Sequence, residues 1–171
     1  AEGWWAPTMI LPNRSAANFE EVHQAVFDVG RPYSVCVNRN TDRFVNEACS
    51  YDRFGVAMVA DQQATGANTP CWMVFDAVYR QKFTAGGIMP SAIMPDRSIP
   101  IDWWDHYVFK ADTVAELARK INLDPVKLES VTRRMTEYAA NGEDPEFGRG
   151  STIYDKTFGE LPAEVKNSIS H

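Results

Sequence analysis

Residues 31–54 (RPYSVCVNRNTDRFVNEACSYDRF) constrain the fold of this chain more than any other stretch. Over residues 33–37, apolar residues alternate with small or polar ones, which is typical of a strand with one buried face. Residues 38–42 (NRNTD) are of the types that form tight turns, and residues 43–45 are expected to return as a second strand. The spacing therefore predicts a hairpin, followed by a helix that begins near Tyr51. From spacing alone, this tyrosine is either a structural residue or a group that reaches into a cleft.

The C-terminal third predicts two helices that pack on a sheet. Thr113 and Glu116 have the spacing of a capping box, and apolar residues follow at helical intervals. Asp124 followed by Pro125 is typical of the start of a second helix, which is expected to end before Gly142. Strands early in the chain and helices late indicate the α+β class, with a small mixed or antiparallel sheet and helices packed on it.

The other elements are predicted from apolar runs and from turn residues rather than from complete sets of caps. In chain order they are a weak helix or long loop over 18–29, a helix from Tyr51 to about residue 63, a central strand over 71–76, a short helix over 77–83 capped by Asp76, an irregular excursion over 84–100, and loops over 143–159.

Composition excludes some classes of function. A length of 171 residues suits one domain with a substantial core. The net charge of −6 and the lack of a basic run argue against nucleic acid or an anionic membrane as partner. No apolar run approaches the roughly 20 residues of a membrane span, and no signal peptide is recognisable.

The three cysteines, Cys36, Cys49 and Cys71, form no CxxC pair and have no histidine at ligand spacing. We therefore expect no metal site and no disulfide framework, and free thiols in a reducing cytoplasm. The chain starts at Ala1 and continues with two tryptophans, Trp4 and Trp5, which should be covered by this fold or by a further part. We interpret it as a processed product or as a segment of a longer protein.

The motifs of common enzymes are missing from the sequence. It contains no GxGxxG, no P-loop, no HExxH and no GxSxG, so a self-contained nucleotide-binding or metal-dependent enzyme is not predicted. The residues by themselves predict an α+β domain with an aromatic-rich surface, and they do not indicate a particular activity.

Four segments resemble one known family. Residues 37–55 (VNRNTDRFVNEACSYDRFG) resemble the pattern VNRxGxRFxNExxxYDxFG of FAD-dependent 3-ketosteroid dehydrogenases, which belong to the flavoprotein group of fumarate reductase and succinate dehydrogenase. Residues 71–80, 110–118 and 141–154 are similar to later segments of the same family, in the same order. The resemblance covers about residues 31–159.

The resemblance implies that residues 1–171 are a single cap, or catalytic, domain, and that the FAD-binding Rossmann domain lies outside this chain. In that family the 3-ketosteroid lies between the cap and the flavin, a hydride passes to flavin N5, and a tyrosine takes a proton. Tyr51 matches that tyrosine. FAD is then bound by the other domain of the same polypeptide, this chain holds no cofactor-binding residue, and the fragment alone is inactive.

Other residues are weaker candidates. Four apolar residues of the excursion are expected to line a steroid pocket: Ile88, Met89, Ile93 and Met94. Arg43 and Glu47 form either a pair that orients the hairpin or a solvated surface pair. Asp144 and Arg149 are expected to fix a loop.

The family pattern leaves the regiochemistry open between Δ1 and Δ4 dehydrogenation. It also leaves two alternative functions. One is the cap of a fumarate-reductase-like flavoprotein that acts on another substrate, which is disfavoured because a dicarboxylate needs several cationic groups. The other is a stand-alone ligand-binding domain.

Overall fold

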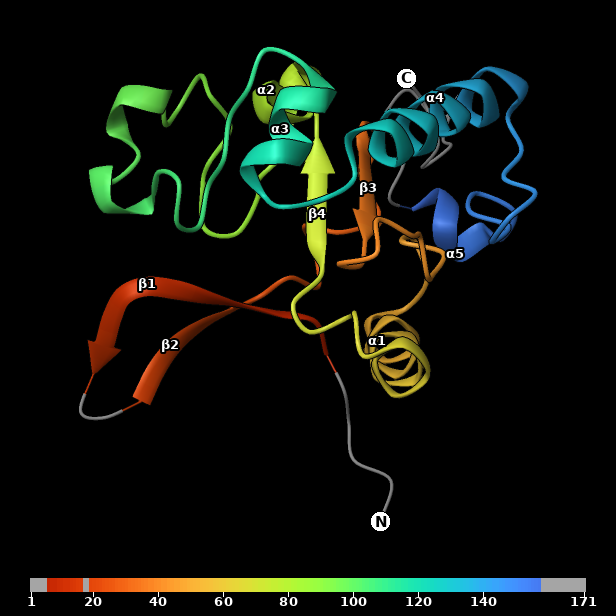
Figure 1. Ribbon diagram of the computed structural model, residues 1–171, viewed down its shortest axis with the longest axis horizontal. Coiled ribbons are helices and arrows are strands. Elements are labelled where there is room, and N and C mark those ends of the chain that lie inside the picture. The colour runs from red at the N-terminus through yellow and green to blue at the C-terminus, as the bar shows by residue number, and fades with distance from the viewer. Residues whose placement is uncertain (1–5, 17–18, 158–171) are drawn as a thin grey trace.

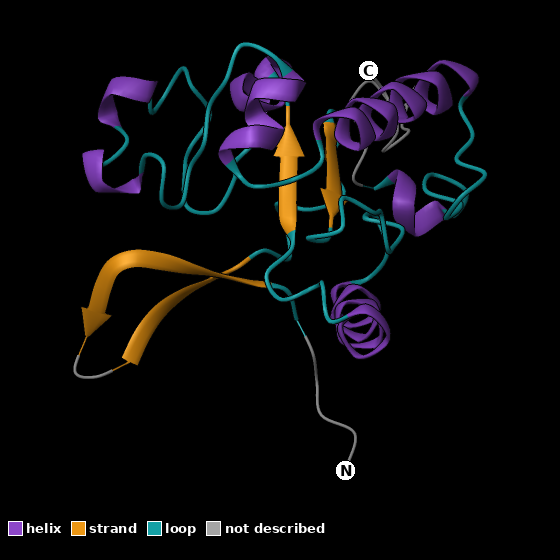
Figure 2. Cartoon of the chain, viewed as in Figure 1, coloured by secondary structure: helices purple, strands orange, loops and turns teal. Residues whose placement is uncertain are grey.

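The computed structural model describes residues 6–16 and 19–157, and its architecture is shown in Figures 1 and 2. Its elements are β1 (Thr8–Ala16), β2 (Phe19–Gln24), β3 (Ser34–Val37), α1 (Tyr51–Thr65), β4 (Trp72–Phe75), α2 (Ala77–Lys82), the 3-10 turns η1 (Asp96–Ser98) and η2 (Ile101–Trp103), α3 (Val114–Lys120), α4 (Pro125–Asn141) and α5 (Ile153–Lys156). Both sheets are antiparallel pairs, β1 with β2 and β3 with β4, which confirms the α+β class. Trp4 and Trp5 lie outside the described residues.

The β3–β4 pair lies at the centre of the molecule, with Val35 opposite Val74 and Cys36 opposite Met73. The hairpin predicted over residues 33–45 is therefore wrong, because β3 pairs with β4 and not with residues 43–45. The turn itself is confirmed: the Asn38 side chain accepts hydrogen bonds from the backbone N–H groups of residues 40 and 42. After this turn the chain directs Arg43 into a buried charged cluster, so that segment does not return along β3.

Both faces of β3 are covered, contrary to the expected single buried face. On one face, Val35 and Val37 pack with Ala118, Leu128 and Val131 of α3 and α4. On the other face, Cys36 belongs to a second cluster that includes Phe54 of α1. The expected packing of two C-terminal helices on a sheet is thus confirmed.

The predicted helix caps are also confirmed. Thr113 Oγ1 accepts a hydrogen bond from the N–H of Glu116 at 3.2 Å, at the start of α3. Asp124 Oδ1 accepts from two N–H groups in the first turn of α4, and Gly142 follows that helix with φ 70°. Asp76 caps α2 as expected, because its side chain accepts from the N–H of Tyr79.

The helix or loop expected over residues 18–29 is wrong for its first part, which is strand β2. The strand pairs with β1, placing Ile10 opposite Val22 and Met9 opposite His23. The apolar run of residues 9–11 provides a pairing partner, and this tertiary contact overrides a weak helical pattern. Figure 1 shows the β1–β2 ribbon as an arm that projects from the rest of the fold.

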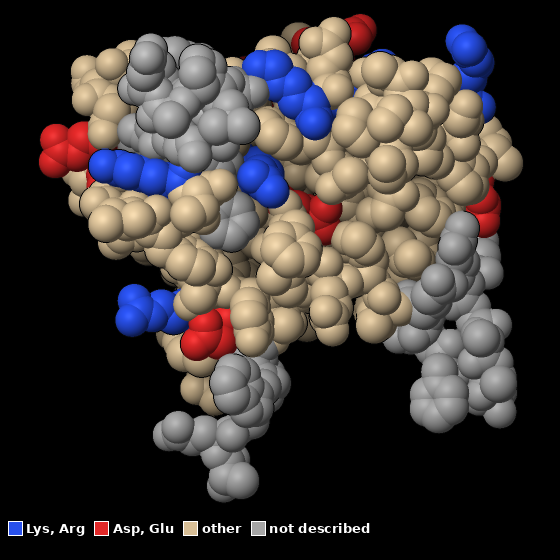
Figure 3. Space-filling view, turned by 180° about the vertical axis from the view of Figure 1, so that it is seen from behind, with Lys and Arg blue, Asp and Glu red and all other residues tan. Residues whose placement is uncertain are grey.

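The surface is unevenly charged. Figure 3 shows a face on which Lys, Arg, Asp and Glu are sparse over most of the visible area. Within residues 6–16 and 19–157, no helix has the length and apolar character needed to cross a membrane.

Candidate functional site

Tyr51 is the first residue of α1 and its side chain is at the surface, with the residue 38% exposed. One turn further along, Phe54 is fully buried and its ring meets the edge of Phe44, with centroids 5.7 Å apart. The buried Phe54 anchors the start of the helix, whereas Tyr51 occupies the first helical position, at the exposed end of α1. Ser50 occupies the N-cap in an extended conformation but makes no side-chain capping hydrogen bond.

The segment that leads into Tyr51, residues 46–50, is held from several sides. Asn46 Oδ1 accepts a hydrogen bond from the N–H of Ala48 at 2.9 Å, which forms a local turn. Asn46 Nδ2 donates to Asp155 Oδ2 at 2.9 Å, so α5 is tied to this segment. Gly30 approaches its backbone so closely that an added Cβ would lie 2.8 Å from the Cα of Ala48.

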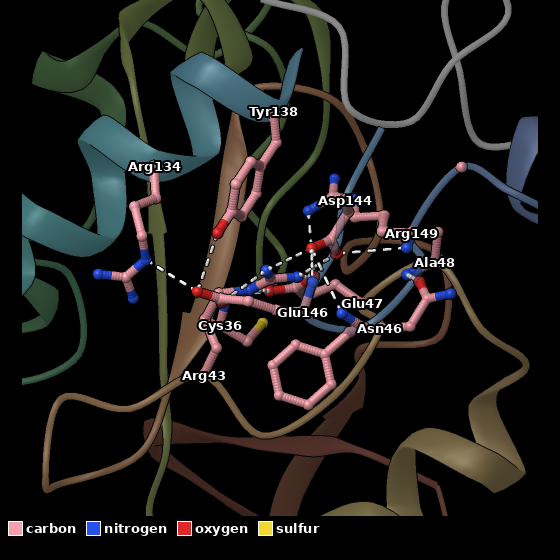
Figure 4. A network of polar contacts seen from close by, with 12 residues as sticks. Cys36, Arg43, Asn46, Glu47, Ala48, Arg134, Tyr138, Asp144, Glu146 and Arg149 are labelled. Atoms are coloured by element: carbon pink, nitrogen blue, oxygen red, sulfur yellow. Dashed lines mark hydrogen bonds and ion pairs between the residues drawn. The ribbon is translucent and has the colours of Figure 1, made fainter. Parts of the chain in front are cut away.

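A buried charged cluster of Arg43, Glu47, Asp144 and Arg149 lies beside this segment (Figure 4). Arg43 Nη2 lies 2.9 Å from Glu47 Oε2 and 2.9 Å from Asp144 Oδ2. Arg149 Nη1 lies 3.3 Å from the same Glu47 oxygen. These four side chains are at most 2% exposed, so the interpretation of Arg43 and Glu47 as a solvated pair is wrong.

The charges of the cluster balance, and the ionised forms of its acids are favoured. Burial opposes ionisation of Glu47, but Arg43 and Arg149 outweigh it and hold the pKa of Glu47 below its ordinary value. Burial also opposes ionisation of Asp144, whose pKa is nevertheless lowered by its hydrogen bonds to Arg43 and to backbone N–H groups. Two guanidinium groups thus neutralise two carboxylates in the interior, which is the arrangement that makes such burial tolerable.

Asp144 shapes the loop that follows α4, as expected. Its carboxylate accepts hydrogen bonds from the backbone N–H groups of Glu146, Phe147 and Arg149. Glu146 extends the cluster toward solvent, since it accepts hydrogen bonds from Arg134 and Tyr138 of α4.

The thiols near the site are poor nucleophiles. Burial raises the pKa of Cys49 to about 11, with a further contribution from the negative charge of Asp155. Burial likewise raises the pKa of Cys71 to about 11 and that of Cys36 well above its ordinary value. Since the thiolate is the reactive form, these cysteines do not suit covalent catalysis at neutral pH.

A cavity of about 1050 Å³ lies between α2, the loop after it, the β3–β4 sheet and helices α3 and α4. Its lining is largely apolar and includes Val35, Ile88 and Leu117. Tyr51 does not line it. The described residues therefore place the cavity and the tyrosine at separate positions.

Of the four candidates for a steroid wall, only Ile88 lines the cavity. Ile88 is buried in a cluster with Leu11, Ile99 and Trp103, and Met94 packs against that same cluster. Met89 and Ile93 are 43% and 68% exposed. Their contact with a substrate stays a prediction, as does the catalytic role of Tyr51.

Sequence reasoning did not find the residues that hold the lead-in segment. Asn46 and Asp155 are 109 residues apart, and Arg43 and Asp144 are 101 apart. The one local signal was the i, i+4 spacing of Arg43 and Glu47, which is typical of many surface pairs.

The sheets within the described residues are antiparallel pairs. FAD and NAD are commonly held by a parallel βαβ unit with a glycine-rich turn at the helix N-terminus. Residues 6–16 and 19–157 form only antiparallel sheets and contain no such unit. Over the same residues, no group of three or more His, Cys, Asp or Glu is placed to hold a metal ion.

Comparison with known proteins identifies relatives over nearly the whole chain. A 3-oxosteroid 1-dehydrogenase of Mycobacterium tuberculosis is 31% identical over 164 residues, which cover 93% of this chain and 27% of that protein. The 4-oxocyclohexanecarboxylate 2-dehydrogenase of Sinomonas cyclohexanicum is 32% identical over 162 residues, which cover 93% of this chain and 26% of that protein.

A solved structure gives the same result. The crystal structure of 3-ketosteroid delta1-dehydrogenase from Sterolibacterium denitrificans, in complex with 1,4-androstadiene-3,17-dione, matches with a TM-score of 0.84 and 30% identity. The match covers 98% of this chain and 28% of that one. The chain thus spans about a quarter of the length of the relatives that it matches.

A family model described as FAD binding domain matches residues 1–167. Together with these relatives, it confirms the resemblance seen in the sequence motifs, and the chain belongs to this FAD-binding family of flavoproteins.

Proposed function

We propose that this chain is the cap, or catalytic, domain of an FAD-dependent dehydrogenase that introduces a double bond beside the keto group of a 3-ketosteroid. The observation that carries this proposal is the match of nearly the whole chain to a 3-ketosteroid delta1-dehydrogenase solved with a steroid, at a TM-score of 0.84 and 30% identity. Sequence identity to 3-oxosteroid 1-dehydrogenases supports it independently of the structure. By analogy with those relatives, Δ1 dehydrogenation is favoured over Δ4.

The part that this chain would play is removal of a proton. The substrate loses a proton from the carbon next to its carbonyl group and a hydride from the adjacent carbon, and a double bond forms between the two. Tyr51 would accept the proton on its phenolate oxygen. Its position suits this role, because Tyr51 is the first residue of α1 and is 38% exposed, so that a substrate can reach its phenol.

Tyr51 would need a further partner for this chemistry. An ordinary phenol has a pKa of about 10 and is a weak base at neutral pH without help. We propose that the FAD-bearing domain of the same polypeptide, outside residues 1–171, covers Tyr51 and completes the site. The exposure of Tyr51 at the start of α1 supports contact with such a domain, since the phenol is accessible to a further part of the protein. FAD bound there would supply the acceptor for the hydride.

A second candidate substrate is a small cyclic ketone that carries a carboxylate. The relative named 4-oxocyclohexanecarboxylate 2-dehydrogenase is as similar to this chain as the steroid enzymes are, at 32% identity. Both substrates are six-membered ring ketones that lose hydrogen next to the carbonyl group, so the same proton acceptor would serve either one.

The test uses the full-length enzyme and its Tyr51→Phe variant, assayed with an artificial electron acceptor on two substrates. These are the 1,2-dihydro form of 1,4-androstadiene-3,17-dione and 4-oxocyclohexanecarboxylate. The variant should lose about 10²- to 10⁴-fold in turnover while it retains FAD absorbance, because a general base typically contributes that much. Near-normal turnover would refute the role of Tyr51. If the enzyme turns over 4-oxocyclohexanecarboxylate but not the steroid, the proposed substrate is the monocyclic acid and not the steroid.

A further inference from the structure

We propose that Asn46 and Glu47 are positioning residues for Tyr51, and that they fix where its phenol oxygen is presented to the substrate. The inference rests on the proposed function of Tyr51. Its starting point is that α1 begins at Tyr51 without a side-chain cap from Ser50, so the first turn is not fixed by the usual local device. The position of Tyr51 is therefore set by the buried Phe54 on one side and by the residues that precede Tyr51 on the other.

Glu47 ties this segment to the central sheet. Its Oε1 accepts a hydrogen bond from the backbone N–H of Cys36 in β3 at 3.2 Å, and also from Arg43 Nε at 3.1 Å. Its other oxygen lies 2.9 Å from Arg43 Nη2 and 3.3 Å from Arg149 Nη1. A carboxylate that accepts four hydrogen bonds in the interior has little freedom to move, and the backbone four residues before Tyr51 is fixed with it.

Arg149, which binds Glu47, also contacts the chain around the start of β3. It donates to the backbone carbonyl of Ser34, the first residue of β3, at 2.8 Å and to that of Arg31, three residues earlier, at 2.7 Å. The segment before Tyr51, the first residues of β3 and the loop after α4 are thereby joined into one rigid unit, which Figure 4 shows around Glu47.

Asn46 ties the segment to α5. Its amide donates to Asp155 Oδ2, which also accepts from the N–H of Gly150 at 3.0 Å. The other oxygen of Asp155 accepts from Thr152 Oγ1 at 2.6 Å, so this carboxylate is itself held in place. Asn46 and Glu47 are adjacent in sequence but bind different partners, and the two tethers together restrict both the position and the direction of the chain that enters α1.

Such restraint matters for a proton transfer. Reacting groups must lie about 3 Å apart, and a displacement of 1 Å can lower a rate by about 10²-fold. A residue that only stabilises the fold would change the amount of active enzyme. A residue that places the base would change the rate of the proton step itself.

The experiment measures kcat, KM and the primary deuterium isotope effect in the full-length enzyme, on steroid deuterated at the carbon that loses the proton. The first variant is Asn46→Ser, whose hydroxyl still accepts from the N–H of Ala48 but is too short to reach Asp155. We expect kcat to fall by about 10- to 100-fold, KM to change by less than about threefold, and the isotope effect to rise. Glu47→Gln, which keeps the shape of the side chain, should give the same pattern.

Asp124→Ala is the matched control. It removes the side-chain cap of α4 and should lower thermal stability without changing residues 46–50. Its isotope effect and its kcat per FAD-loaded enzyme should equal those of the parent. The inference is wrong if Asn46→Ser behaves like Asp124→Ala, or if a lower kcat comes with an unchanged isotope effect. A normal rate in Tyr51→Phe would instead overturn the proposed function, so the two failures are distinguishable.

Discussion

Replacement of Gly30 by alanine should weaken the fold by more than the left-handed backbone alone explains. Gly30 has φ +82°, and a Cβ at this position would lie 2.6 Å from the carbonyl oxygen of Glu47 and 2.8 Å from the Cα of Ala48. Both atoms belong to the backbone and cannot rotate away. The segment before Tyr51 would have to shift by several tenths of an ångström.

The magnitude has two parts. A residue with a Cβ costs about 1–2 kcal/mol in the left-handed conformation. Forcing an extra carbon into a packed site typically costs a further ~1–3 kcal/mol. Gly30→Ala should therefore lower the free energy of unfolding by about 2–5 kcal/mol, the sum of the two contributions.

Gly66 offers a control for the first part alone. It also lies in the left-handed region, with φ +69°, but no atom lies within 4 Å of the position that a Cβ would occupy there. Gly66→Ala should cost only about 1–2 kcal/mol. Urea unfolding of both variants and the parent measures the difference. If the two substitutions cost the same within about 0.5 kcal/mol, the close approach of Gly30 to the backbone at 47–48 has no energetic weight, and the reasoning fails.

Two further predictions concern the core and the buried charges. Leu128→Ala should lower the free energy of unfolding by about 2–5 kcal/mol, because Leu128 is fully buried between α4 and the central sheet; a loss below about 1 kcal/mol would contradict that packing. The pKa values of Glu47 and Asp144 are lowered in the folded state, so their contribution to stability is fully present above their ordinary values of 4.5 and 3.8 and is lost as the pH falls below them. Calorimetry from pH 7 to pH 3 should show a falling Tm in the parent. In Asp144→Asn the Tm should be lower at pH 7 and should fall less steeply with acid, whereas an unchanged slope would exclude Asp144 as a source of the acid sensitivity.

What could be predicted from the sequence depended on how far apart the interacting residues are. The caps of α3 and α4 link residues two or three positions apart, so Thr113 and Asp124 could be recognised directly. The partner of β3 begins 35 residues after β3 ends, beyond a whole helix, and no local pattern favours it over residues 43–45. The arm strand β2 was missed for the same reason, since its pairing with β1 outweighs its own propensity.

The candidate site shows the same division. The start of α1 at Tyr51 followed from local pattern, and its proposed role followed from the resemblance of residues 37–55 to a family motif. The contacts that hold residues 46 and 47 could not be predicted from the sequence. Arg43 has the same sequence spacing to Glu47 whether the pair is buried or solvated. Burial of the pair depends on Asp144 and Arg149, which enter from a loop about a hundred residues later.

This separation along the chain has a consequence for the order of folding. The bonds from Arg43 to Asp144, from Arg149 to Arg31 and from Asn46 to Asp155 close loops of 101, 118 and 109 residues. Contacts between such distant residues carry a large loop-closure entropy and tend to form late, whereas capped helices such as α4 can form locally. During synthesis, the segment before Tyr51 leaves the ribosome long before the residues that hold it. The geometry around Tyr51 would then be among the last features to form, and it would be present only in molecules in which the whole domain has folded.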